Sequence, residues 1–165
     1  MARTPNPGTT RALFYEGVWY CFSNFAAFKV RWRDIDWMTS EHSYQAAKFM
    51  GRSLELVEAI RDAPSADEAK RIAHRPGTED LVRPDWDQIR VKVMEEILRA
   101  KLAQHWFVRR SLYHSGKREL IEDSPKDEFW GRGRDWKGLN HLGKLWMKLR
   151  DEFWDELEIE FSTAA

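Results

Sequence analysis

The sequence has little of what several classes of protein require. Its 165 residues contain one cysteine, Cys21, so no disulfide can form within the chain and a reducing compartment fits. Lys and Arg number 27, as do Asp and Glu, which leaves no basic surplus of the kind that coats nucleic acid. No apolar run is long enough to span a membrane, and residues 1–10 lack the apolar segment of a secretory signal. These absences favour a cytoplasmic protein without a membrane partner.

Metal-binding and hydrolase motifs are also missing. No two of the five histidines have the spacing of a helix-borne ligand pair, and no second cysteine could join them. No Gly-x-Ser-x-Gly nucleophile elbow is present. Cys21 lies in the apolar run Trp19-Tyr-Cys-Phe22, where a small buried residue is the expected role. We therefore expect neither a metal nor a cofactor.

What the sequence does contain is a series of short strands and amphipathic helices. Strands are predicted at residues 12–15, 28–32, 35–37 and 119–122, the second and third forming a hairpin. Helices are predicted at residues 39–50, 54–61, 65–74, 85–104, 107–114 and from Asn140 to about Phe153. There is no internal repeat and no long linker. The pattern predicts a loose N-terminal arm, residues 1–11, followed by a single compact, helix-rich α+β domain with a small β-sheet, residues 12–161.

The predicted helix from Thr39 to Met50 concentrates polar side chains on one face. Thr39 or Ser40 can cap it, because a hydroxyl accepts from an unpaired N–H of the first turn. The positions i, i+3, i+4 and i+7 of this face hold an acid, a phenol, an amide and an amine, namely Glu41, Tyr44, Gln45 and Lys48. Taken alone, such a face is typical of an exposed helix with a weak Glu–Lys pair. The alternative is a binding site.

A second polar stretch, residues 127–134, reads Asp-Glu-Phe-Trp-Gly-Arg-Gly-Arg. Its glycines allow a ligand to approach the backbone closely, and guanidinium groups of Arg132 and Arg134 match phosphate oxygens. Asp127 and Trp130 are three residues apart, so one turn could direct both at one cavity. The stretch matches neither a dinucleotide-binding fingerprint nor a P-loop. A glycine-rich surface turn with a solvated arginine pair remains the alternative.

Taken in order, these pieces resemble the NADAR family, which includes the YbiA-like N-glycosidases. The motifs that carry the resemblance are Phe22-Ser-Asn-Phe25, Trp37-x-x-x-Glu-His-x-Tyr-Gln-Ala-x-Lys-Phe49, Ala69-Lys70, Trp86-x-x-x-Arg90-x-x-x-Met94, Lys101, Asp127-x-x-Trp-Gly-x-Gly133 and Gly138-x-Asn-x-Leu-Gly143. The resemblance covers residues 14–153. It implies a compact, helix-rich α+β fold and cleavage of N-glycosidic bonds in phosphorylated ribosyl compounds.

The resemblance also implies which residues form the site. The catalytic positions are Glu41, Lys48 and Asp127, and Lys48 matches a lysine proposed to attack the sugar. The substrate-binding positions are Asn24, Gln45, Lys70, Trp86, Arg90, Trp130, Gly131 and Asn140. One departure lies after Lys70, where residues 71–75 read Arg-Ile-Ala-His-Arg and the family often has glycine near Ala73. That departure affects the local phosphate or sugar contacts.

The chemistry of these groups agrees with N-glycoside cleavage. Breaking the C1–N bond builds positive charge on the sugar, which a carboxylate stabilises, and the leaving nitrogen requires a proton. A lysine with a lowered pKa can instead capture C1 of the opened sugar as a Schiff base. Glu41 and Asp127 supply the carboxylates, and Lys48 supplies the amine.

We therefore expect an N-glycosidase that hydrolyses ribosylaminopyrimidine phosphates, intermediates of riboflavin biosynthesis. One alternative is an ADP-ribosyl glycohydrolase, for which nucleic acid is a partner only as a modified-guanine substrate. Another is a non-catalytic module that binds ADP-ribose or an NAD derivative. The zero net charge favours the small-molecule substrate. The sequence leaves the oligomeric state open.

Overall fold

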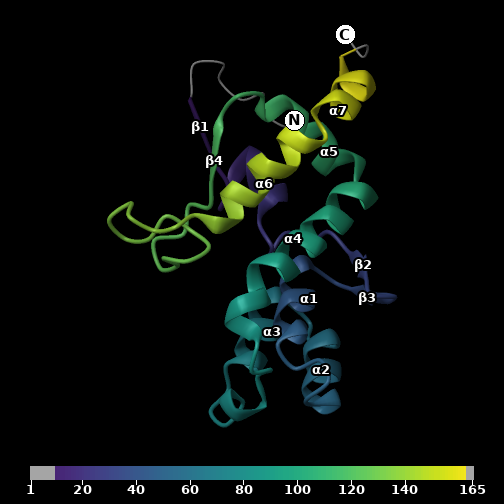
Figure 1. Ribbon diagram of the computed structural model, residues 1–165, viewed down its shortest axis with the longest axis vertical. Coiled ribbons are helices and arrows are strands. Elements are labelled where there is room, and N and C mark those ends of the chain that lie inside the picture. Colours follow the sequence, from purple (N-terminus) through teal and green to yellow (C-terminus); the bar gives the residue numbers. More distant parts are fainter. Residues whose placement is uncertain (1–9, 163–165) are drawn as a thin grey trace. The chain divides into compact units, whose positions relative to one another are not determined.

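Residues 10–162 are described by the computed structural model, and they pack as two units (Figure 1). One unit consists of residues 10–23 and 105–162, and the other of residues 24–104. Each combines helices with a two-stranded sheet, which confirms the α+β class. The predicted arm, residues 1–11, lies outside the described residues up to residue 9, and Arg11 begins the first strand. Within residues 10–162, no helix is both long enough and apolar enough to cross a bilayer.

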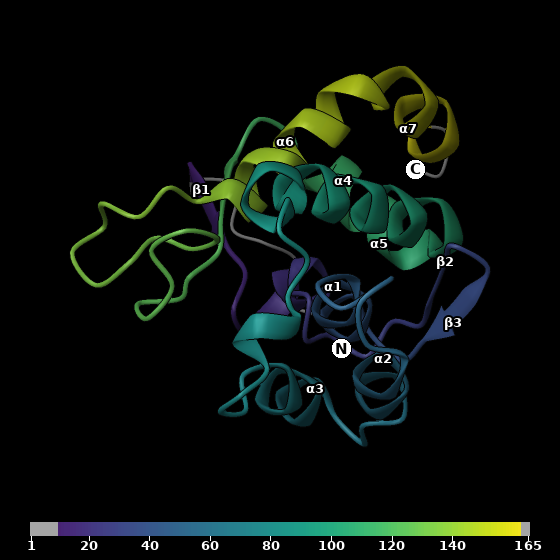
Figure 2. The same cartoon turned by 60° about the horizontal axis from the view of Figure 1, so that its bottom comes forward.

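The unit of residues 24–104 is organised around one buried helix (Figure 2). Helix α1 (Ser40–Ala47) packs against α2 (Leu54–Arg61), α3 (Ala66–Ala73) and α4 (Trp86–Gln104). Strands β2 (Val30–Trp32) and β3 (Ile35–Trp37) form the predicted antiparallel hairpin that leads into α1. A 3-10 helix, η2 (Glu79–Leu81), lies between α3 and α4. All eight residues of α1 are buried, so this helix forms the centre of the unit.

The other unit combines residues 10–23 with residues 105–162. Strand β1 (Arg11–Leu13) pairs in parallel with β4 (Glu119–Ile121), and α6 (His141–Glu152) packs on β4. Helix α5 (Trp106–Ser115) packs against α7 (Trp154–Phe161) and the 3-10 helix η1 (Gly17–Phe22). The buried Trp146 donates its indole N–H to the carbonyl of Phe22 over 2.9 Å, which ties α6 to η1. The sequence predicted neither η1 nor α7.

Side-chain caps mark where α1, α2 and α3 begin. Thr39 Oγ1 accepts from the N–H of His42 at the start of α1, and Ser65 Oγ accepts from the N–H of Glu68 at the start of α3. The Ser65 cap was predicted, and Thr39 was one of the two candidates, Thr39 and Ser40, for the cap of α1. Ser53 makes the equivalent bond to the N–H of Leu56 at the start of α2.

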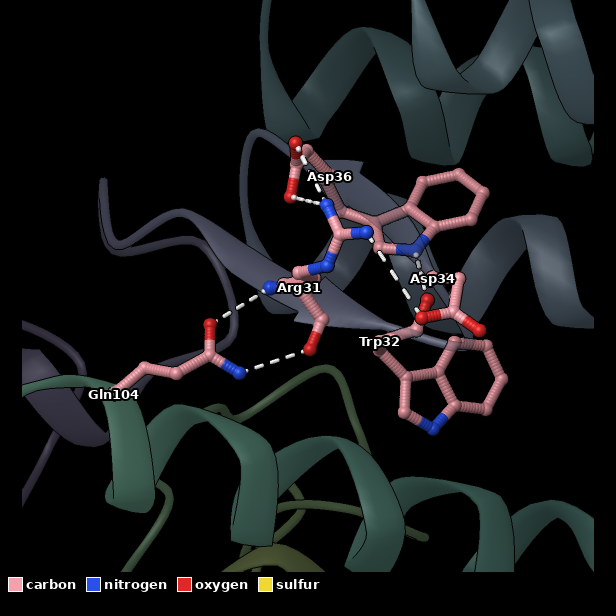
Figure 3. A network of polar contacts seen from close by, with 6 residues as sticks. Arg31, Trp32, Asp34, Asp36 and Gln104 are labelled. Carbon is pink, nitrogen blue, oxygen red and sulfur yellow. Dashed lines mark hydrogen bonds and ion pairs between the residues drawn. The ribbon is translucent and has the colours of Figure 1, made fainter.

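The outer edge of β2 is covered by one side chain. The side-chain amide of Gln104 accepts from the N–H of Arg31 and donates to its carbonyl, both over 2.8 Å (Figure 3). Gln104 therefore makes the two bonds that a neighbouring strand would make. The Arg31 guanidinium lies beside Asp36 on the paired strand, 3.2 Å from Oδ1. The two bonds between Gln104 and Arg31 connect the end of α4 to the hairpin, although the two residues are 73 positions apart in the sequence.

We expect Gln104→Ala to lower the free energy of unfolding by about 1 kcal/mol, because it removes two hydrogen bonds from a partly hydrated strand edge. Thermal melting followed by circular dichroism would measure the loss. Gln88→Ala is the matched control, since Gln88 is an exposed glutamine of the same helix. Equal melting temperatures for the two variants would show that the Gln104 contact contributes nothing.

Candidate functional site

The polar face of α1 is buried. The exposed fraction is 5% for Glu41, 2% for Gln45 and 9% for Lys48. The interpretation of this face as an exposed helix surface is therefore wrong. The face is buried because α2, α3 and α4 all pack against α1. The spacing of residues within one helix does not reveal such packing. Burying a polar group costs free energy unless it is hydrogen-bonded, so the contacts of these side chains decide what the helix is for.

The acidic end of this face is rich in hydrogen-bond acceptors. Gln45 Nε2 donates to Glu41 Oε1 over 2.6 Å, and the Glu41 N–H donates to the carbonyl of Asn24 over 3.0 Å. The side-chain Nδ2 of Asn24 donates to the sulfur of Met94. The remaining oxygens, Asn24 Oδ1 and Gln45 Oε1, are buried and accept no hydrogen bond from the described residues. Unpaired buried acceptors are rare in native proteins, and they fit a ligand that carries hydroxyl or N–H donors.

Lys48 lies at the end of α1 with its amine in a desolvated position. Burial is the main cause that lowers the pKa of Lys48 to about 8; Glu41 opposes the shift, and the charges of Lys70 and Arg90 add to it. The amine lies 5.7 Å from the centroid of the Tyr44 ring. At pH 8 roughly half of the Lys48 side chains carry a neutral amine, which is the nucleophilic form. An exposed lysine would be almost fully protonated at that pH.

Two further cations belong to the same unit. Lys70, on α3, is exposed, and its amine lies 5.7 Å from the ring centroid of Phe25. Arg90, on α4, lies 3.7 Å from a carboxylate oxygen of Asp87. Both are close enough to Lys48 to lower its pKa by charge repulsion. Together with Lys48 they form a local positive region in a chain of zero net charge, which suits a phosphate group.

An aromatic pair adjoins the amine. The rings of Tyr44 and Trp86 lie 5.1 Å apart between centroids and are tilted by 52°. Both side chains are less than a tenth exposed. This pair joins the first turn of α4 to α1 and supplies flat apolar surface next to Lys48.

The glycine-rich segment lies in the other unit and is shaped by its own side chains. Asp127 Oδ1 accepts from the N–H groups of Phe129, over 3.0 Å, and Trp130, over 2.7 Å. Arg132, which the sequence offered as a phosphate ligand, is paired with Asp123 and stacks on the Trp136 ring, 4.4 Å from its centroid. The guanidinium of Arg132 therefore already makes its contacts with neighbouring residues, Asp123 and Trp136.

Asn140 and Gly131 support this segment through the backbone. Asn140 occupies the N-cap position of α6, but its side chain does not cap the helix. Instead its Oδ1 accepts from the N–H of Glu122 and its Nδ2 donates to the carbonyl of Leu120, both over 3.0 Å. A Cβ at Gly131 would lie 3.0 Å from the carbonyl oxygen of Asp127, so a side chain there would fit only if the turn moved by a few tenths of an ångström. The substrate-binding roles of both residues stay predictions.

Comparison with known proteins places this arrangement in a family. Residues 13–154 match the model of the NADAR domain. The chain belongs to the NADAR family. It is 38% identical over 144 residues to the N-glycosidase Npun_R5314 of Nostoc punctiforme, which covers 85% of this chain and 91% of that protein. The N-glycosidase YbiA of Escherichia coli (strain K12) is 38% identical over 131 residues, 79% of each chain.

Two further comparisons extend the family assignment. The chloroplastic riboflavin biosynthesis protein PYRR of Zea mays is 37% identical over an alignment of 142 residues, and this alignment covers 79% of this chain and 23% of that protein. The NMR structure of E. coli YbiA aligns with a TM-score of 0.81 and 33% identity, covering 94% of this chain and 92% of that one. The predicted NADAR, YbiA-like fold is thereby confirmed.

The predicted site of this NADAR chain is divided between the two units. Seven predicted residues belong to residues 24–104: Asn24, Glu41, Gln45, Lys48, Lys70, Trp86 and Arg90. Asp127, Trp130, Gly131 and Asn140 belong to the other unit. The prediction that Glu41 and Lys48 share one cavity with Asp127 and Trp130 stays a prediction. Within the described part of the chain, no group of three or more His, Cys, Asp or Glu side chains could hold a metal ion.

Sequence reasoning missed one neighbour of Lys48. His74 Nε2 lies 3.3 Å from Lys48 Nζ, whereas most of the five histidines were expected to be surface or capping residues. The available signal was its spacing, because His74 follows Lys70 by four residues and so shares its helix face. His42, the other histidine of this region, is a structural residue: it is fully buried between Thr39 Oγ1 and the carbonyl of Ala63.

Proposed function

We propose that this protein hydrolyses the N-glycosidic bond of a phosphorylated ribosyl compound, with ribosylaminopyrimidine phosphates of riboflavin biosynthesis as its substrates. The class, a hydrolase of N-glycosyl bonds, is that of its relatives, which are 38% identical over most of their length. The observation that carries the proposal is the pair of buried groups on α1. Glu41 and Lys48 place a carboxylate and an amine with a pKa of about 8 on the same helix face.

The surroundings of this pair match the parts of such a substrate. The unpaired oxygens of Asn24 and Gln45 accept from the sugar hydroxyls. Lys70 and Arg90 hold the phosphate, and the Tyr44–Trp86 pair shields the sugar from water. The riboflavin part of the proposal draws on the relative from Zea mays, whose name assigns it to that pathway.

The mechanism follows from the amine. The N-linked ribose opens when the C1–O4 bond breaks, O4 gains a proton, and C1 becomes doubly bonded to the leaving nitrogen. The lone pair of Lys48 Nζ then adds to C1, the leaving nitrogen takes a proton and departs as an amine, and a Schiff base between C1 and Nζ remains. Water adds to C1 and releases the free sugar aldehyde and Lys48. Glu41 stabilises the positive charge on C1 and nitrogen and orients the water.

Binding without turnover is the competing class. A module that only recognises ADP-ribose needs donors and acceptors but gains nothing from an amine held near its deprotonated form. Desolvating Lys48 costs free energy, and pKa shifts of this kind cluster at functional sites, where a neutral amine can act as a nucleophile. The small-molecule partner, the absence of a cofactor and a cytoplasmic location remain parts of the proposal.

The test is a comparison of initial rates on two substrates with the purified protein. We expect ribose 5-phosphate to be released from a ribosylaminopyrimidine phosphate faster than ADP-ribose from ADP-ribosylated guanine in DNA, because the chain has no basic surplus for a polymer. Faster release of ADP-ribose would reverse the substrate assignment. Binding of ADP-ribose without turnover of either substrate would establish a binding module and reject the proposal.

A further inference from the structure

His74 has one defined tautomer. Its Nδ1 lies 2.7 Å from the carbonyl oxygen of Lys70, one turn earlier on α3. A carbonyl oxygen can only accept, so Nδ1 carries the hydrogen and Nε2 of the neutral ring carries the lone pair. That lone pair faces Lys48 Nζ over 3.3 Å. His74 is therefore an acceptor for the amine of Lys48.

The environment keeps this acceptor neutral. Partial burial of the ring lowers the pKa of His74 below its ordinary value of 6.5, the bond to the Lys70 carbonyl opposes that shift, and the charges of Lys48 and Lys70 lower the pKa further. The charged groups around the contact come from three helices: Glu41 on α1, Lys70 on α3 and Arg90 on α4. At neutral pH the ring is thus able to accept, while at acidic pH a protonated ring would face an ammonium group.

We propose that His74 is a positioning residue that holds the Lys48 amine and receives the proton it releases. The inference rests on the proposed role of Lys48 as the nucleophile. In this step the neutral amine of Lys48 forms the bond from Nζ to C1, which leaves a positive charge on Nζ; one N–H bond of this nitrogen then breaks, its electron pair stays on Nζ, and the proton moves to Nε2. The imidazolium then passes a proton to water, which it can reach because His74 lies at the exposed end of α3. Lys48 itself is buried and has no such access.

Two ionisations should govern the reaction if His74 acts in this way. Lys48 must be neutral to attack, and His74 must be neutral to accept. We expect the logarithm of kcat/KM to rise with a slope of 1 below pH 8 and with a slope of 2 below the pKa of His74. In His74→Gln the amide oxygen can still accept a hydrogen bond but does not titrate. That variant should keep a slope of 1 throughout and lose about tenfold to a hundredfold in rate.

The control is His114→Gln, because burial also lowers the pKa of His114 but this residue belongs to the other unit. The His114→Gln variant should show the same dependence of kcat/KM on pH as the unmodified protein. His74→Asn serves as a second variant if His74→Gln unfolds, and the melting temperature of each reports folding. A slope of 2 that persists in both variants would overturn the proposal.

A measurement without substrate separates this inference from the proposed function. Trinitrobenzenesulfonate labels neutral amines, and peptide mass spectrometry gives the labelling rate of Lys48 at each pH. We expect the acid limb of Lys48 labelling to change in His74→Gln. If it changes while Lys48→Ala retains turnover, His74 contacts the Lys48 amine as described but the proposed role of Lys48 as the nucleophile fails. If Lys48→Ala is inactive, but His74→Gln changes neither the labelling of Lys48 nor the slopes of the pH profile, the inference about His74 fails and the proposed function stands.

Discussion

Lys48→Ala is expected to lower kcat by about 10⁴-fold or more while leaving ligand binding measurable, because it removes the nucleophile and not the binding groups. Lys48→Arg should be equally inactive, since a guanidinium stays protonated and cannot attack C1. Borohydride added during turnover should reduce the Schiff base and leave a stable sugar adduct on Lys48. Single-turnover kinetics and peptide mass spectrometry would measure both effects.

The matched control is Lys92→Ala, an exposed lysine of α4, which should keep the unmodified rate and the adduct. The rate should also rise with pH through about 8, since the neutral fraction of Lys48 grows as the pH passes its pKa. Near-normal turnover of Lys48→Ala without any adduct would assign Lys48 an electrostatic role beside Glu41. Direct attack by water, assisted by a carboxylate, would then replace the Schiff-base route.

Gly143→Ala is expected to lower the free energy of unfolding by about 3 kcal/mol or more, because the first turn of α6 has no room for a methyl group. A Cβ at Gly143 would lie 2.0 Å from the carbonyl oxygen of Leu120 and 2.6 Å from both polar atoms of the Asn140 side chain. Relieving the overlap would separate α6 from β4 and break the Asn140 bond to Leu120. Chemical denaturation would measure the loss.

Gly51→Ala separates this steric effect from the conformational cost of replacing a glycine. Gly51 has a φ of +77°, and a Cβ added there would meet no atom within 4 Å. Its substitution therefore costs about 1–2 kcal/mol through the backbone alone. The close approach of helix and strand at Gly143 would be refuted if its variant were no less stable than that of Gly51.

The local parts of the fold were predictable from the sequence. The bounds of α2 agree with the prediction, Ser65 caps the helix that it was expected to cap, and Thr39 is the one of two candidates, Thr39 and Ser40, that caps α1. These features depend on residues within one turn of each other. The parallel pairing of β1 with β4 was beyond such reasoning, because it joins Arg11 to Glu119 across most of the chain.

The candidate site was predictable in composition but not in environment. Periodicity placed Glu41, Gln45 and Lys48 on one face of α1, and the structure agrees. Their burial, and the lowered pKa of Lys48, come from helices packed around α1 that periodicity does not detect. His74 was missed for the same reason, since its contact with Lys48 spans 26 residues.

The complete burial of α1 places the requirements of activity in conflict with those of folding stability. Two unpaired acceptors, Asn24 Oδ1 and Gln45 Oε1, each cost on the order of 1–3 kcal/mol, and the desolvated Lys48 adds to that cost. An apolar helix of the same shape would give a larger free energy of unfolding, but it would have no groups for catalysis. Mutational drift toward stability at these positions is therefore opposed by selection for turnover. Engineering for heat resistance should leave α1 unchanged and begin at exposed apolar positions such as Ile159 on α7.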